Sequence, residues 1–109
     1  MFLILEELVK IIKKRKLYSL NENKSYTYKL LKNKELCFKK FREEALELLD
    51  AAKYKNKKSV IHESADLLYH FFVLLELKKV SVNSIMKELK RRKKISGIQE
   101  KKNRKKNVR

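Results

Sequence analysis

Residues 59–78 read SVIHESADLLYHFFVLLELK, and this stretch decides the fold. Its apolar side chains recur at helical spacing around nearly the whole circumference of one predicted helix, which Ser59 can cap and which ends near Lys78. They are Ile61, Ala65, Leu67, Leu68, Phe71, Phe72, Val73, Leu74 and Leu75. A helix that is apolar on all sides has to be buried on most of them, and a chain of 109 residues offers little surface for that. The stretch therefore predicts a helical bundle that is completed by dimerisation.

The rest of the sequence is also helical in pattern. The chain has no Pro and a single Gly, Gly97, and these are the residue types that interrupt helices and form tight turns. Apolar spacing predicts helices over residues 2–17 and 34–54, a short helix over 26–31 capped by Ser25, and a last helix capped by Ser81 that ends near Lys93. The polar, Asn-rich residues 18–24 predict a loop. The predicted fold class is all-α, with one helical domain over residues 1–94 and a basic C-terminal tail over residues 95–109.

The net charge of +17 raises the question of a nucleic-acid partner. Residues 87–109 contain 12 Lys or Arg and only two Asp or Glu, so most of the excess lies near the C-terminus. The basic residues are mainly Lys, which an AT-rich genome also favours, and no nucleic-acid partner is expected. The longest apolar run, residues 71–75, is far too short to span a membrane, and the single cysteine, Cys37, fits a reducing compartment. We expect a cytoplasmic protein without a membrane partner.

Two groups of carboxylates stand out against this basic background. They are Glu43, Glu44 and Glu47 in the predicted helix over residues 34–54, and Glu63 and Asp66 in the helix that follows. At about 100° per residue, Glu44 points close to Leu48 on the apolar stripe of its helix. Glu63, Asp66 and His70 share one face of theirs. Glu47 and Glu43 lie on the flank of the stripe that carries Glu44, so carboxylates of both helices are expected to converge near the core. His62 is interpreted as a surface residue.

Carboxylates that face a core are destabilising unless something compensates their charge. A hard divalent cation such as Mg²⁺ does so, because it prefers oxygen ligands. The alternative interpretation is that these are solvated glutamates paired with lysines, which is the usual role of charge runs on helices. For Glu43 the two interpretations are equally supported. For Glu44, Glu47, Glu63 and Asp66 we favour metal binding, because their directions coincide with apolar stripes.

The pattern Glu-Glu-x-x-Glu at 43–47 followed by Glu-x-x-Asp at 63–66 resembles the motif pair of the MazG-type all-helical nucleotide pyrophosphohydrolases. Further segments resemble one branch, the phosphoribosyl-ATP pyrophosphohydrolases of the second step of histidine biosynthesis. They are Ser25-Tyr26-Thr27, Lys39-Lys40, the run ESADLLYH at 63–70, and residues 89–92, 96–98 and 100–102. That branch usually has Gly before the paired glutamates, where this chain has Arg42. Arg42 either alters the packing there or offers another phosphate contact.

The resemblance implies a MazG-like homodimer that hydrolyses phosphoribosyl-ATP to phosphoribosyl-AMP and pyrophosphate. Mg²⁺ would be held by Glu44, Glu47, Glu63 and Asp66, and either Glu47 or Glu43 would act on the attacking water. The substrate-binding residues would be Lys39, Lys40, Ser25, Tyr26, Thr27, Tyr69 and His70. Other roles remain open: Lys39 and Lys40 as solvated lysines, Ser25 as a helix cap, and His70 as a hydrogen-bonded core histidine.

Two other functions fit parts of the sequence. A house-cleaning (d)NTP pyrophosphohydrolase would share the fold, the metal and the chemistry, but would not need the segments at 25–27 and 96–98. A basic helical nucleic-acid-binding or scaffold protein would explain the tail but not the core-facing carboxylates. Its binding would weaken steeply with salt and would not need magnesium.

Overall fold

The computed structural model describes residues 3–18 and 25–93, and these form five α-helices and no strand. The helices are α1 (Leu3–Tyr18), α2 (Tyr26–Lys32), α3 (Lys34–Tyr54), α4 (Lys57–Leu77) and α5 (Val82–Lys93). The predicted all-α class is confirmed. Most of the predicted loop over residues 18–24, and the whole predicted tail over 95–109 with its motif at 96–98, lie outside the described residues.

Polar side chains begin the helices, and the sequence predicted two of these caps correctly. The Ser25 hydroxyl accepts a hydrogen bond from the backbone N–H of Tyr28 at 3.1 Å, and Ser81 accepts one from Ser84 at the same distance. The Ser25 hydroxyl thus satisfies one of the backbone donors that lack a partner in the first turn of a helix, whereas the Ser84 N–H also bonds to the Ser81 carbonyl. Ser25 therefore is a helix cap, whatever else it contacts.

The predicted cap at Ser59 is wrong. The helix begins at Lys57, because the side-chain oxygen of Asn56 accepts a hydrogen bond from the backbone N–H of Ser59 at 2.9 Å. Asn is as good a cap as Ser, and the extended backbone of Asn56 suits the position before a helix. Ser59 consequently lies within the first turn of α4.

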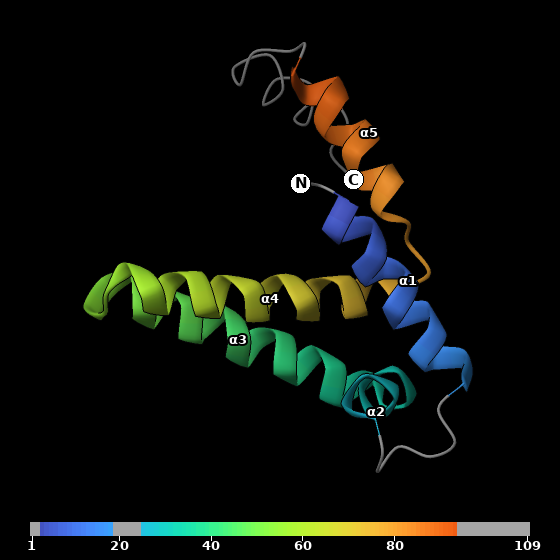
Figure 1. Cartoon of the computed structure of the whole chain (residues 1–109), viewed down its shortest axis with the longest axis horizontal. Helices are drawn as coiled ribbons and strands as arrows, with labels where there is room; N and C mark the ends of the chain where they lie inside the picture. Colours follow the sequence, from blue (N-terminus) through green and yellow to red (C-terminus); the bar gives the residue numbers. More distant parts are fainter. Residues whose placement is uncertain (1–2, 19–24, 94–109) are drawn as a thin grey trace, which may run out of the picture.

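The helix α4 ends without glycine. The backbone N–H of Val80 bonds to the carbonyl of Leu75 at 2.9 Å, and Lys79 takes a positive φ of 57° between them. This arrangement satisfies carbonyl groups at the end of the helix, in a conformation that glycine adopts more easily than lysine. The turn redirects the chain into α5, which extends away from the other helices (Figure 1).

Helices α3 and α4 lie side by side as an antiparallel hairpin, and α1 and α2 pack at one end of it (Figure 1). The buried core lies at that end. Its members are Ile12 from α1, Leu30 from α2, Cys37 from α3, and Phe72, Val73 and Leu75 from α4. The C-terminal half of α4 is therefore buried by the other helices of the same chain.

The other end of the hairpin has no such cover among the described residues. Ile61 of α4 is 70% exposed, and Leu46, Leu49 and Leu68 are also exposed. The expectation that α4 is buried on most sides is thus met within the chain only for its C-terminal half. Dimerisation stays a prediction. No described helix is long and apolar enough to cross a membrane.

Candidate metal and substrate site

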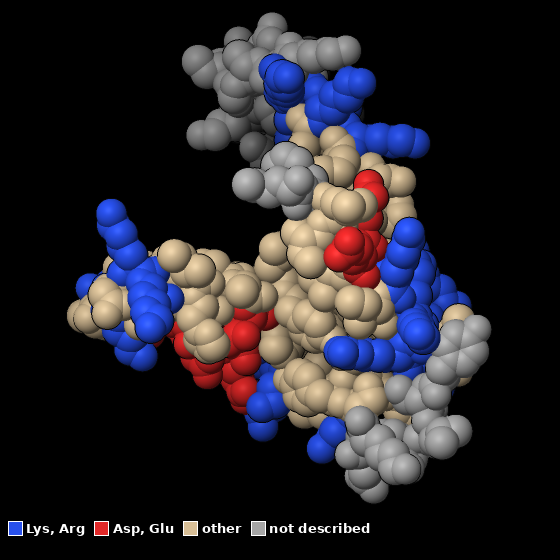
Figure 2. Space-filling model, viewed as in Figure 1, with Lys and Arg blue, Asp and Glu red and all other residues tan. Residues whose placement is uncertain are grey.

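The two acidic motifs meet on the α3–α4 hairpin. Glu44 and Glu47 of α3 and Glu63 of α4 each place a carboxylate oxygen within 4.8 Å of the others. Figure 2 shows acidic side chains gathered over this hairpin, in a molecule whose charge is otherwise mostly basic. The antiparallel pairing of α3 and α4 brings together residues that are about 20 positions apart in the sequence.

A second group of ligand atoms shares Glu63. The side chains of His62, Glu63 and Asp66 also lie within 4.8 Å of one another, and His62 Nε2 is 3.4 Å from an Asp66 oxygen. His62 is exposed, as expected, but the sequence interpretation did not connect it with the acidic residues. The signal was its spacing of four residues before Asp66, which places both side chains on one face of the helix.

Two carboxylate oxygens of the site are buried without a partner among the described residues. They are Oε2 of Glu44 and Oε2 of Glu63. A buried acceptor without a hydrogen bond is destabilising, and more so when it carries charge. A cation between α3 and α4 would give both oxygens a partner, and carboxylate oxygens are ligands that Mg²⁺ prefers. The residues present therefore fit a magnesium ion.

The electrostatics of Glu44 agree with this interpretation. Burial raises the pKa of Glu44 above its usual value, and the neighbouring Glu47 raises it further, while His70 opposes the shift. Asp66 adds a smaller contribution in the raising direction. Protons and a metal ion therefore compete for the same carboxylate, and a bound divalent cation would favour its charged form.

The basic residues before the first motif border the site on one side. Lys40 Nζ lies 3.2 Å from a Glu43 oxygen, and this hydrogen bond raises the pKa of Lys40. Lys40 and Glu43 both influence the Tyr26 hydroxyl, whose pKa is raised chiefly by burial. Lys39 and Arg42 are exposed on α3. Of the two predicted lysines, Lys40 is thus the one with contacts at the site.

Tyr26 connects the acidic site to the core through His70. The Tyr26 hydroxyl is 2.8 Å from His70 Nε2, and His70 Nδ1 is 2.7 Å from the backbone oxygen of Asp66. Because a carbonyl oxygen can only accept, His70 Nδ1 carries a proton and donates it. In the neutral imidazole, Nε2 then accepts from Tyr26. His70 is only 8% exposed, so this bond fixes the ring next to the second motif.

A parallel chain of contacts runs through the neighbouring residues. The Tyr69 hydroxyl is hydrogen-bonded to the Thr27 hydroxyl and accepts another hydrogen bond from Arg15 Nη1 at 2.8 Å. Thr27 is 1% exposed, so its hydroxyl serves the packing of α2 against α4. Sequence reading did not single out Arg15. It lies 54 residues from Tyr69, and no local pattern indicates such a contact.

Comparison with known proteins agrees with this arrangement. Residues 5–93 match the model of the phosphoribosyl-ATP pyrophosphohydrolase family. Phosphoribosyl-ATP pyrophosphatase 1 of Bradyrhizobium diazoefficiens is 46% identical over 82 residues, which cover 74% of this chain and 77% of that protein. Phosphoribosyl-ATP pyrophosphatase of Nitrosomonas eutropha is 39% identical over 105 residues, which cover 95% and 88% of the two chains.

A third relative is longer. The histidine biosynthesis bifunctional protein HisIE of Pyrococcus furiosus is 48% identical over 92 residues, which cover 84% of this chain but only 42% of that protein. The family match over residues 5–93 includes both acidic motifs. The resemblance found in the sequence is confirmed, and the chain belongs to the phosphoribosyl-ATP pyrophosphohydrolase family.

Proposed function

We propose that this chain hydrolyses phosphoribosyl-ATP to phosphoribosyl-AMP and pyrophosphate with Mg²⁺ bound between α3 and α4. The main support for a bound metal ion is the pair of buried carboxylate oxygens, on Glu44 and Glu63, that have no hydrogen-bond partner among the described residues. Family membership supports the substrate. Glu44, Glu47, Glu63 and Asp66 would hold the ion. Bound there, Mg²⁺ would neutralise charge on the polyphosphate and polarise the phosphorus that is attacked.

The chain's own residues would position the reactants. Hydrolysis needs a water molecule directed at a phosphorus and a way to stabilise the departing pyrophosphate. Glu47 and Glu43 remain the two candidates for orienting the water. Lys40 lies beside Glu43 and would contact phosphate oxygens, with Lys39 next to it on α3. Tyr26 and His70 form one wall of the site and keep a fixed geometry through their mutual hydrogen bond.

We also propose a homodimer. The exposed apolar residues of the hairpin, Leu46, Leu49, Ile61 and Leu68, lie on the same two helices as the acidic site. Covering them with the hairpin of a second copy would give the hairpin the burial that α1 and α2 provide only at one end. The acidic site would then be enclosed by the bundle, which strengthens electrostatic interactions within it.

The deciding experiment is pyrophosphate release from phosphoribosyl-ATP, with and without Mg²⁺, beside a panel of ordinary nucleoside triphosphates. Glu44→Gln should abolish the release and weaken Mg²⁺ binding measured by calorimetry, because the amide cannot serve as an anionic ligand. The same substitution should raise the melting temperature of the metal-free protein, because it removes repulsion from Glu47. Glu35→Gln, on the exposed first turn of α3, is the matched control and should change none of these quantities.

Each outcome has a clear meaning. Magnesium-dependent release from phosphoribosyl-ATP alone supports the proposal. Release only from ordinary triphosphates would replace it with the house-cleaning function. No release from any nucleotide, together with unchanged Mg²⁺ affinity in Glu44→Gln, would overturn both the substrate and the metal site.

A further inference from the structure

Arg15 of α1 is an exposed residue whose side chain is hydrogen-bonded beside the site. Its Nη1 donates to the Tyr69 hydroxyl at 2.8 Å, and Tyr69 is bonded in turn to the buried hydroxyl of Thr27. An arginine on a surface helix usually samples many conformations, and ordering it reduces its entropy. Here the contact joins three helices, α1, α2 and α4, so the guanidinium is directed at α4.

The charge of Arg15 has no acidic partner among the described residues, whereas Lys13 and Lys16 of the same helix do have one. Lys13 and Lys16, on the same helix, both lie 3.3 Å from the Glu76 carboxylate. Lys40, at the acidic site, is paired with Glu43. The guanidinium of Arg15 has five N–H donors, of which the Tyr69 contact uses one. A planar guanidinium that is oriented by such a contact, with donors that no described residue accepts, is suited to two-pronged binding of a phosphate.

The residue that contacts Arg15 lies within one turn of α4 from the metal-binding carboxylates. Tyr69, which holds Arg15, follows Asp66 by three residues, a rise of about 4.5 Å along the helix. The Tyr69 and His70 rings are in edge contact with centroids 6.0 Å apart, and His70 bonds to the Asp66 backbone. The Arg15 guanidinium and the metal-binding carboxylates therefore lie on opposite sides of the Tyr69 and His70 rings.

We propose that Arg15 is a specificity-determining residue that binds the monophosphate on the second ribose of the substrate. This inference rests on the proposed function. Phosphoribosyl-ATP has a triphosphate at one end and a phosphate monoester at the other, and ordinary nucleoside triphosphates lack the monoester. The carboxylates and their metal ion would bind the triphosphate. Arg15 would bind the phosphate monoester, which is the group that ATP lacks.

The test compares Arg15→Gln with Lys14→Gln, which removes one positive charge from an exposed neighbour on the same helix. Arg15→Gln should raise KM for phosphoribosyl-ATP about ten- to a hundredfold, the usual effect of losing a hydrogen bond to a charged group, with little change in kcat. Lys14→Gln should change KM less than threefold, as expected for roughly 0.5 kcal/mol from a surface charge. Arg15→Lys keeps the charge without the planar fork and should fall between them. All variants are assayed below their melting temperatures.

Direct binding of ribose 5-phosphate, followed by NMR titration, separates this inference from the proposed function. Wild type and Lys14→Gln should bind it, with the largest shifts in α1 and around Tyr69, and Arg15→Gln should not. If the wild type fails to hydrolyse phosphoribosyl-ATP but still binds ribose 5-phosphate through Arg15, only the proposed function is lost. If Arg15→Gln binds ribose 5-phosphate and retains the wild-type KM, Arg15 has only a structural role and the inference is wrong.

Discussion

At the scale of single residues, the acidic and aromatic members of the site could be named from the sequence, but their partners could not. Tyr26 and His70 both lie in recognisable motifs, yet they are 44 residues apart, and no local pattern predicts their hydrogen bond. The direction of Glu44 toward the interior followed from helical periodicity alone, since the angle per residue is fixed by backbone geometry. Contacts between helices depend on how the helices pack, which periodicity does not specify.

The Tyr26–His70 bond leads to a residue-scale prediction. Tyr26→Phe keeps the ring and removes the hydroxyl that donates to His70, so a buried nitrogen loses its partner. We expect unfolding to require about 1–2 kcal/mol less free energy, measured by urea denaturation. Hydrolysis should also fall, because the His70 ring next to Asp66 is no longer fixed.

Tyr28→Phe is the matched control for this change. Tyr28 lies on the same short helix and its ring faces the Lys32 ammonium at 5.3 Å, an interaction that phenylalanine retains. The control should keep both stability and activity. Equal losses in the two variants would mean that the Tyr26 hydroxyl has no special role.

At the scale of elements, the helices were predictable because the chain offers few alternatives. Apolar spacing and the absence of proline predicted the helix over residues 34–54, and α3 has these bounds. The cap of α4 was misplaced by three residues, because Asn56 and Ser59 are both good caps in front of the same apolar run. Which one caps depends on the backbone conformation between α3 and α4, where Lys55 is extended and ends the preceding helix.

The position of this cap can be tested directly. Asn56→Ala removes the acceptor for the Ser59 N–H and should lower the free energy of unfolding by about 1 kcal/mol. Ser59→Ala should change it by less than about 0.5 kcal/mol, since alanine favours helices and no described hydrogen bond uses the Ser59 hydroxyl as a cap. Thermal or urea unfolding of both variants measures these differences. A larger loss of unfolding free energy in Ser59→Ala than in Asn56→Ala would show that Ser59 is the cap, as the sequence suggested.

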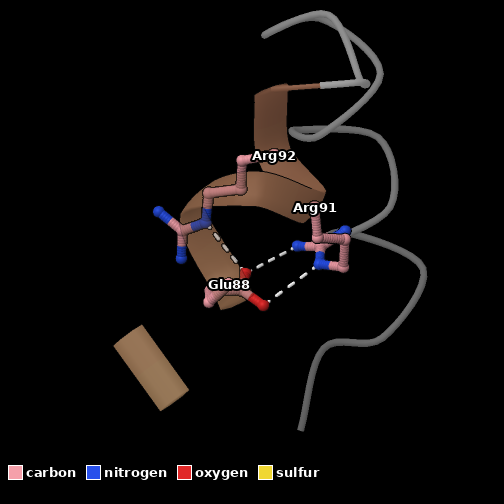
Figure 3. A network of polar contacts seen from close by, with 3 residues as sticks. All are labelled: Glu88, Arg91 and Arg92. Atoms are coloured by element: carbon pink, nitrogen blue, oxygen red, sulfur yellow. Dashed lines mark hydrogen bonds and ion pairs between the residues drawn. The ribbon is translucent and has the colours of Figure 1, made fainter. Parts of the chain in front are cut away.

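The helix α5 has fewer contacts with the rest of the fold, and a local charge network supports it. Glu88 forms hydrogen bonds with both Arg91 and Arg92, at distances between 2.7 and 3.1 Å (Figure 3). These arginines, first Arg91 and then Arg92, lower the pKa of Glu88 from 4.5 to about 2. Pairs at this spacing stabilise exposed helices modestly.

This network predicts a pH dependence of the stability of α5. Because the pKa of Glu88 is lower in the folded protein, its contribution to stability is present above pH 4.5 and is lost as the pH falls toward 2. Hydrogen exchange of the α5 amides should therefore become less protected across this window, relative to amides of α3. Glu88→Gln is already uncharged and should show the weaker protection at all pH values. An α5 whose protection does not respond to acid in the wild type would contradict the prediction.

At the scale of the whole molecule, the distribution of exposed apolar residues predicts the oligomeric state. The core at the α1–α2 end is closed, whereas the far end of the α3–α4 hairpin exposes several leucines and Ile61. Ile61→Lys places a charge in the predicted interface and should shift the dimer–monomer equilibrium at least tenfold toward monomer. Sedimentation equilibrium measures this shift, and the melting temperature of the wild type should rise with protein concentration.

Leu17→Lys provides a control of matched exposure, because Leu17 is 71% exposed and Ile61 is 70% exposed, but Leu17 belongs to α1 and not to the hairpin. Both substitutions place a lysine at a surface position, so neither should unfold the monomer. Dissociation caused by Ile61→Lys alone would locate the interface on the hairpin and would link it to the acidic site on the same helices. Equal effects of the two substitutions, or a wild type that is monomeric at all concentrations, would refute the hairpin interface. The acidic site would then have to function with one side open to water.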